Sequence, residues 1–184
     1  MTPRNPHRGA ASLPRWIDPD ELARSGRWVR GTLQWAELGR LAGAGASGRS
    51  PAVEVGVRAF REPGGAVVIE GRVTAVVTVV CQRCLGDMDL DVQAEFLVAA
   101  ARSGPEAARL RDDFDTIELG CDQRLSLVRL VEDEVLLAVP MVPRHPRRGD
   151  CDAEAMHRLD ALAGGAPPRD NPFEALAALR RRKG

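Results

Sequence analysis

The clearest pattern in this sequence is an alternation of apolar and polar residues through the middle of the chain. It occupies residues 53–57, 67–79 and 88–98, and its period of two is typical of strands that bury one face. The connections between the three stretches are short, which predicts antiparallel pairing. Residues 81–87 would then form the tip of a hairpin, and Gly71 within the second stretch predicts a β-bulge.

A helical period replaces this alternation after Ser126, which is placed to cap a helix over Leu127–Val139 that Pro140 ends. At about 100° per residue, four apolar residues form the centre of one face of this helix. They are Leu127, Val131, Val135 and Ala138. Glu134 falls inside the same face, and we expect it to have a partner because an unpaired buried charge is costly.

Shorter segments carry weaker signals. Asp18 is a candidate N-cap for a short helix over residues 16–26, and Asp152 for a helix that continues to residue 163. Residues 114–119 have the composition of a fourth strand. Residues 101–113 are polar, and we expect a mobile excursion there.

The predicted fold class is α+β. We expect an antiparallel, strongly twisted sheet, open or barrel-like, with the amphipathic helix packed on it and short helices near the ends of the chain. Residues 1–50 would form a helical or extended segment with a Gly-rich linker, residues 51–163 the core domain, and residues 164–184 a linker and a basic C-terminal helix.

Composition narrows the classes of function. Hydrophobic residues make up 44% of the 184 residues, which excludes wholesale disorder, and the formal net charge is zero. Any contact with a polyanion must therefore come from local clusters of arginine. Trp and Phe are few and Tyr is absent, which argues against a base-stacking platform.

The sequence predicts a cytoplasmic protein without a membrane partner. No apolar run approaches the roughly 20 residues that span a bilayer, and the first residues lack the apolar region of a signal peptide. The four cysteines should then be reduced, which favours metal or redox chemistry over disulfides.

Two of these cysteines, Cys81 and Cys84, form a C-x-x-C motif at the predicted hairpin tip, the spacing of half a zinc knuckle. His145 and Cys151 are the natural further ligands, with Cys121 as a substitute. Three interpretations stay open: a structural metal site that holds zinc, reduced thiols without metal, and a redox dithiol. A thioredoxin-type dithiol begins a helix, whereas this motif joins two strands, which argues against the redox interpretation.

Arg83, between the two cysteines, can bind phosphate or pair with Glu134. We expect the ion pair, which would tie the hairpin tip to the long helix. Other basic residues could contact RNA or a protein partner, although short charge runs are often only solvated surface. They are Arg144, Arg147, Arg148, Arg180, Arg181 and Arg182.

The sequence contains no recognisable catalytic motif. It has no paired carboxylates at catalytic spacing and no nucleophile elbow, and its Gly-rich segment at residues 43–48 lacks the GK[ST] of a phosphate-binding loop. We therefore expect no catalytic residues, no enzymatic activity and no small-molecule substrate.

Four motifs, in this order and spacing, resemble one family, the YceD proteins, called large ribosomal RNA subunit accumulation proteins. The motifs are Cys81-Gln82-Arg83-Cys84-Leu85 after a β run, VEDEVLLAVP at residues 131–140, Val142-Pro143-x-His145 with Cys151, and Asn171-Pro172-Phe173. The resemblance runs from about residue 50 to the C-terminus. Ser126 stands where the family usually has Asp, and both cap helices. Cys121 is not part of the family pattern, so the resemblance favours the other candidate residues as metal ligands.

The resemblance implies a non-enzymatic ribosome-biogenesis factor that supports synthesis, processing or stability of large-subunit (23S) rRNA. Neutral charge and scarce aromatics favour contact with the pre-ribosome or with a ribosomal protein, and the gene of ribosomal protein L32 commonly neighbours genes of the family. One alternative is a metal- or thiol-redox-responsive protein that uses Cys81 and Cys84. Another is a simple RNA-binding module, which would bind naked rRNA with a steep salt dependence.

Overall fold

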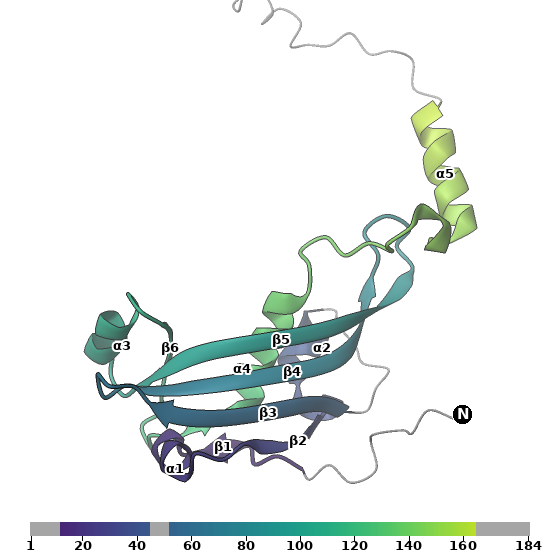
Figure 1. Cartoon of the computed structure of the whole chain (residues 1–184). Helices are drawn as coiled ribbons and strands as arrows, with labels where there is room; N and C mark the ends of the chain where they lie inside the picture. Colours follow the sequence, from purple (N-terminus) through teal and green to yellow (C-terminus); the bar gives the residue numbers. More distant parts are fainter. Residues whose placement is uncertain (1–11, 45–51, 165–184) are drawn as a thin grey trace, which may run out of the picture.

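The computed structural model is built on a five-stranded sheet with the strand order β2-β3-β4-β5-β6 (Figure 1). It describes residues 12–44 and 52–164. The strands are β2 (Val29–Gln34), β3 (Ala52–Arg61), β4 (Val67–Val80), β5 (Asp87–Ala101) and β6 (Asp115–Glu118). The first four pair antiparallel, as predicted, and β6 runs parallel to β5. The α+β class is confirmed, and the sheet is open, with β2 and β6 at its edges.

The longest strands, β4 and β5, form a hairpin whose register runs from Val67 opposite Ala100 to Val80 opposite Asp87. Strand β3 pairs with β4 only from Val67 to Thr74. The rest of the hairpin, residues 75–92, therefore extends past the end of β3 as a two-stranded ribbon, here called the hairpin arm (Figure 1). This arm carries the C-x-x-C motif away from the centre of the sheet.

Gly71 does not form the predicted bulge. It pairs regularly with Val57 in β3 and with Phe96 in β5. The ring of Phe96 occupies the place of a side chain at this position, because a Cβ built there would lie 2.1 Å from Phe96 Cζ. Glycine is required here so that the ring can approach the backbone closely.

The segment after β5 is a helix, α3 (Gly104–Leu110), and not the expected mobile excursion. The hydroxyl of Ser103 caps it by accepting a hydrogen bond from the backbone N–H of Glu106. The helix packs on β5 and β6. Because parallel neighbouring strands need a crossover connection, α3 provides the return that places β6 beside β5.

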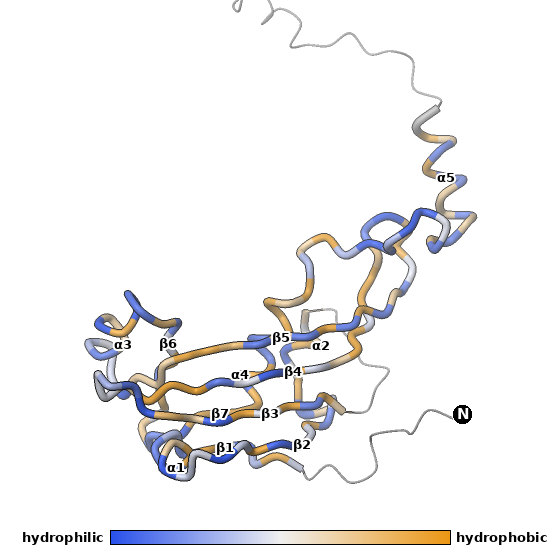
Figure 2. The backbone as a smooth tube through the Cα atoms, viewed as in Figure 1, coloured by the Kyte–Doolittle hydropathy of each residue, from blue (hydrophilic) through white to orange (hydrophobic). Residues whose placement is uncertain are grey.

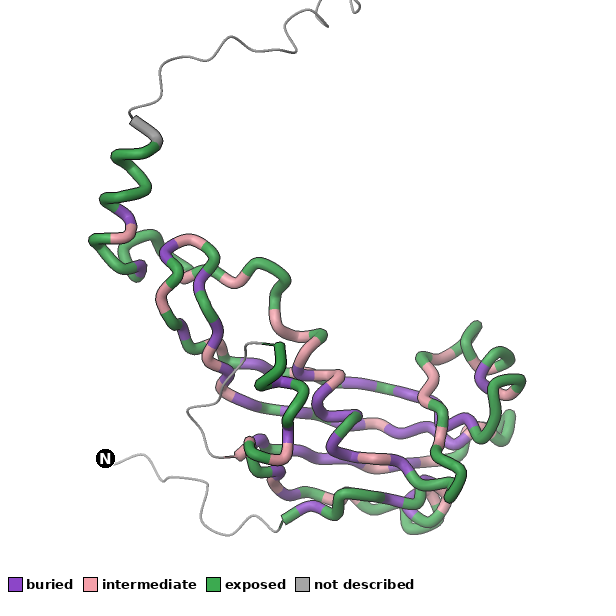
Figure 3. Tube along the Cα trace, turned by 180° about the vertical axis from the view of Figure 1, so that it is seen from behind, coloured by how far each residue is buried: buried purple, intermediate pink, exposed green. Residues whose placement is uncertain are grey.

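The long helix, α4 (Leu127–Ala138), packs on β4 and β5. It lies behind the sheet in Figure 1 and in front of it in Figure 3. Ser126 caps it as predicted, its hydroxyl accepting from the N–H of Arg129. The core lies between this helix and the apolar positions of the strands, which alternate with hydrophilic ones along the sheet (Figure 2).

The N-terminal segment adds to the same core. Strand β1 (Trp16–Ile17) pairs with β7 (Leu125–Ser126), and α1 (Pro19–Ser25) packs on β3 and β4. Asp18 caps α1, as predicted, by accepting two backbone N–H bonds, so the helix begins later than expected. Two further short helices, η1 (Trp35–Glu37) and α2 (Gly39–Gly43), follow β2.

Beyond α4 the chain turns toward the hairpin arm through η2 (Arg148–Asp150) and then forms α5 (Ala153–Gly164). Asp152 begins α5 as predicted, accepting from the N–H of Ala155 at 2.7 Å. Helix α5 projects away from the sheet and is largely exposed, with Met156 buried (Figure 3). Among the described residues, no helix has the length and apolar character needed to span a membrane.

Candidate metal centre

A tight turn at the end of the hairpin arm holds Cys81 and Cys84. The N–H of Cys81 donates to the Gly86 carbonyl at 2.9 Å, and the N–H of Leu85 donates to the Cys81 carbonyl at 2.8 Å. Leu85 has a φ of 61°, a left-handed conformation that non-glycine residues adopt rarely and mostly in constrained turns. The turn therefore fixes both cysteines in one short, ordered loop.

The segment after α4 is held against this turn by a backbone hydrogen bond. The N–H of Gln82 donates to the Pro143 carbonyl at 2.8 Å. His145 follows two residues later, and η2 then turns the chain so that the N–H of Cys151 donates to the Arg148 carbonyl at 3.2 Å. Two stretches far apart in the sequence are thus brought together at the tip of the arm.

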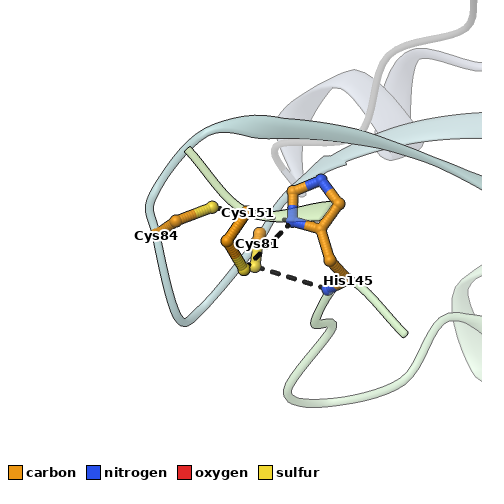
Figure 4. Close-up of side chains that lie close together, drawn as sticks. All are labelled: Cys81, Cys84, His145 and Cys151. Atoms are coloured by element: carbon orange, nitrogen blue, oxygen red, sulfur yellow. Dashed lines mark hydrogen bonds between the residues drawn. The ribbon is translucent and has the colours of Figure 1, made fainter. Parts of the chain in front are cut away.

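Four metal-binding side chains converge there (Figure 4). The sulfurs of Cys81, Cys84 and Cys151 and a ring nitrogen of His145 all lie within 4.8 Å of one another. The His145 Nδ1 atom is 3.5 Å from Cys84 Sγ and 3.6 Å from Cys151 Sγ. All three cysteines are buried and free of disulfides, and His145 is half-buried.

Cys81 lies in an environment that favours the thiolate. Burial raises the pKa of its thiol, but the backbone N–H groups of Cys84, His145 and Arg83 donate to Sγ and lower the pKa to about 5. The N–H donors of Arg83 and His145 lie 3.4 and 3.5 Å from the sulfur. The thiolate is the form of cysteine that binds metals.

Cys151 has the opposite shift. Burial, followed by the neighbouring sulfur of Cys84, raises the pKa of its thiol. One cation faces it, since Nη1 of Arg83 donates to Cys151 Sγ at 3.8 Å. Several buried sulfurs cannot all carry negative charge at this separation unless a stronger cation lies among them.

Two of the distances can be compared with those of a tetrahedral zinc site. Bonds of about 2.3 Å to sulfur and about 2.0–2.1 Å to nitrogen, at tetrahedral angles, hold sulfur and nitrogen about 3.6 Å apart. The two sulfur–nitrogen distances at His145 are 3.5 and 3.6 Å. Three cysteines and one histidine are four donors that could hold one metal ion, and this is a donor set of structural zinc sites.

Comparison with known proteins identifies the family. A family model described as Large ribosomal RNA subunit accumulation protein YceD matches residues 69–180. The chain belongs to the YceD family. A relative from Haemophilus influenzae, "Large ribosomal RNA subunit accumulation protein YceD", is 29% identical over 171 residues, which cover 92% of this chain and 97% of that protein. No solved structure matches the chain.

The expected ion pair between Arg83 and Glu134 is absent from the described part of this YceD-family chain. The Arg83 guanidinium faces Cys151. Glu134 is half-buried on α4, where burial and then the carboxylates of Asp133 and Asp115 raise its pKa. The described residues that shift the pKa of Glu134 include no cation. The hairpin arm is therefore joined to the segment after α4 by the cysteine–histidine cluster, the Arg83 contact with Cys151 and the Gln82–Pro143 backbone hydrogen bond.

The buried carboxylate of α4 is Glu132, which sequence reasoning missed. Its side chain is 3% exposed, and Oε1 accepts from the backbone N–H of Arg40 at 2.7 Å, at the start of α2. The helical period gave the angular order of residues around α4 but not the direction of the sheet or of α2. The contact joins residues 92 positions apart, so no local signal could have revealed it.

The basic loop after α4 is largely engaged in local ion pairs. Arg144, Arg147 and Arg148 are exposed. Arg147 pairs with Asp150 at 3.3 Å, and Arg148 pairs with Asp160 of α5. Only Arg144 has no ion pair within the described ranges, which weakens the loop as a general polyanion contact.

The remaining predicted site residues lie elsewhere. Arg180, Arg181 and Arg182 are outside the described residues. Cys121 is exposed in the connection between β6 and β7 and is not part of the cysteine–histidine cluster. It therefore offers a natural control for experiments on the other cysteines.

A second group that sequence reasoning missed lies on the sheet face opposite α4. The guanidinium carbons of Arg30, Arg58 and Arg72 lie 5.4, 5.2 and 5.8 Å from the centre of the Trp28 ring. The alternation of Trp28 and Arg30 was the only local signal, because the other two arginines come from different strands and join the group through the register of the sheet.

Proposed function

We propose that this chain is a non-enzymatic ribosome-biogenesis factor that supports synthesis, processing or stability of large-subunit 23S rRNA. The observation that carries the proposal is membership of a family named for accumulation of large-subunit ribosomal RNA, with a match over residues 69–180. The closed donor set of the cysteine–histidine cluster supports a structural role for the cluster, because a catalytic metal site keeps an open position.

The partner is the pre-ribosome, reached through RNA or through a ribosomal protein such as L32. The test is sucrose-gradient profiling of a strain that lacks the gene. Free small subunits should accumulate while large subunits and 23S rRNA are depleted, and the wild-type gene should restore both. A normal large-subunit peak in the deletion strain would overturn the proposal.

The cysteine–histidine cluster holds one structural zinc ion, bound by Cys81, Cys84, His145 and Cys151. The support is the agreement between the observed sulfur–nitrogen distances of 3.5 and 3.6 Å and those of a tetrahedral site. Metal analysis of the purified chain should find one zinc per chain. Cys81→Ser should lose most of it, whereas the matched variant Cys121→Ser should retain it. Equal zinc content in both variants would refute the assignment.

A thiol-redox role for Cys81 and Cys84 is the alternative, and the low pKa of the Cys81 thiol favours it. The two roles differ in the response to mild oxidant. A redox pair would form a Cys81–Cys84 disulfide reversibly while the rest of the chain stays folded, whereas a zinc site would release metal as its sulfurs oxidise. Mass spectrometry of the thiols together with a zinc-sensitive dye separates these results.

A further inference from the structure

The sheet face opposite α4 carries an aromatic and basic cluster of Trp28, Arg30, Arg58 and Arg72, here called the Trp28 patch. Arg30 and Arg72 both pair with Gly56 of β3 and so share its face of the sheet. The indole lies over this glycine, since a Cβ built at Gly56 would be 3.6 Å from two atoms of the Trp28 ring. The missing side chain makes room for the ring between two arginines.

Two of the three guanidinium groups are available to an external anion. Arg58 pairs with Glu70 at 2.5 Å. Arg30 and Arg72 are exposed and take part in no ion pair of the described residues. Both remain within 6 Å of the indole centre, where the attraction between cation and ring holds them in place.

Next to the indole the surface of the sheet is hollowed. The hollow has a volume of about 410 Å³. Its lining residues are Trp28, Glu70, Gly71, Arg72, Glu95, Phe96 and Leu97. Gly71 has no side chain, and the ring of Phe96 lies on the opposite, core face, so these two residues contribute only backbone to the hollow. Leu97 is 45% exposed. No helix covers the middle of this face (Figure 1).

We infer that the Trp28 patch binds single-stranded RNA, with one base in the hollow between Trp28 and Leu97 and the adjoining phosphates bound by Arg30 and Arg72. Unpaired bases stack on aromatic rings and guanidinium planes, and guanidinium groups bind phosphate with two parallel hydrogen bonds. A duplex keeps its bases stacked within the helix, so it cannot fill the hollow. The choice of RNA among polyanions rests on the proposed function.

Two carboxylates lie on the rim of the hollow: Glu70, which is paired with Arg58, and Glu95, which takes part in no ion pair of the described residues. They reduce the positive potential, so that charge alone does not hold a partner here, and contacts with the ring and with a carboxylate must add to the binding. A carboxylate accepts hydrogen bonds from the exocyclic amino groups of bases. The acidic side chains of a protein carry no such donors when they are ionised. The combination of two arginines without ion pairs, a half-buried indole and the carboxylate of Glu95 therefore favours nucleic acid over a protein partner.

The test is fluorescence anisotropy of the full chain with a labelled single-stranded RNA of about 12 nucleotides, within the range of site sizes for such surfaces. Arg30→Ala/Arg72→Ala should weaken binding about tenfold and reduce the slope of log affinity against log salt by about 1.4, or about 0.7 per phosphate contact. Trp28→Leu should weaken binding about tenfold with little change in slope.

The matched control is Arg124→Ala/Arg129→Ala, which removes the same charge from exposed residues outside the patch. It should bind like the wild type. Equal losses in control and patch variants, equal binding of a duplex of the same length, or effective competition by polyglutamate would each overturn the inference.

Thermal melting of each variant detects misfolding, and the arginine pair, being exposed, tests the patch even if Trp28→Leu fails to fold. Patch variants that bind RNA normally would refute this inference and leave the proposed function untouched, because the proposed function is tested separately by the deletion strain.

Discussion

Replacing Gly71 with alanine should destabilise the chain by forcing Phe96 out of its place in the core. The new methyl carbon would lie 2.1 Å from Phe96 Cζ and 2.7 Å from each Cε atom, whereas carbon atoms in favourable contact are about 3.5–4.0 Å apart. The ring must therefore retreat by about 1.5 Å. Phe96 is buried among the core residues, so the displacement strains its neighbours, and we expect a cost of about 2 kcal/mol.

Thermal unfolding followed by circular dichroism measures this cost. A loss of about 2 kcal/mol lowers Tm by about 4–8 °C in a chain of this size. Gly64→Ala is the matched control, because a Cβ at Gly64 would meet nothing within 4 Å, and it should leave Tm unchanged or slightly higher.

Phe96→Leu should partly relieve the clash, so the Gly71→Ala/Phe96→Leu double variant should lose less stability than the sum of the two single variants. A Gly71→Ala variant that melts with the wild type, or strictly additive single losses, would refute the reasoning.

Three further predictions concern carboxylates. Glu132→Ala leaves the N–H of Arg40 without its acceptor and should lower the free energy of unfolding in urea by about 1–3 kcal/mol. Asp133→Ala breaks an exposed ion pair with the Arg40 side chain and should lower it by less than about 1 kcal/mol. Burial raises the pKa of Glu134, which favours folding below its ordinary pKa and penalises it above, so Glu134→Gln should raise Tm at neutral pH and not in acid. Two arginines hold the pKa of Asp20 below 3.8, so its contribution is present above that pH and lost below it, and Asp20→Asn should flatten the loss of Tm with acid.

Much of the fold could be predicted because its signals are local. The alternation in β3, β4 and β5 and the caps at Asp18, Ser126 and Asp152 depend on neighbouring residues, and the structure confirms them. The parallel strand β6 and its crossover helix α3 follow from a long-range arrangement that the polar composition of the segment concealed. The role of Gly71 was misread because its partner, Phe96, belongs to another strand.

The candidate site shows the same division. Residue type and spacing selected Cys81, Cys84, His145 and Cys151, and the structure places them together. The prediction that Glu134 pairs with Arg83 was wrong, because a helical period orders side chains around an axis without giving the direction of the neighbouring sheet. The Trp28 patch stayed hidden because scarce aromatics argued against stacking, whereas one ring is sufficient once the register surrounds it with arginines.

The position of the cysteine–histidine cluster at the end of the hairpin arm affects which part of the chain unfolds first. A two-stranded ribbon is marginally stable in water by itself, and this ribbon is bound to the rest of the chain at its far end by the cluster and one backbone hydrogen bond. With zinc bound as proposed, chelation should therefore unfold the tip of the ribbon and release α5, while the part of the sheet covered by α4 stays folded. On the same proposal, zinc starvation would leave the chain with a folded sheet and an unfolded arm tip.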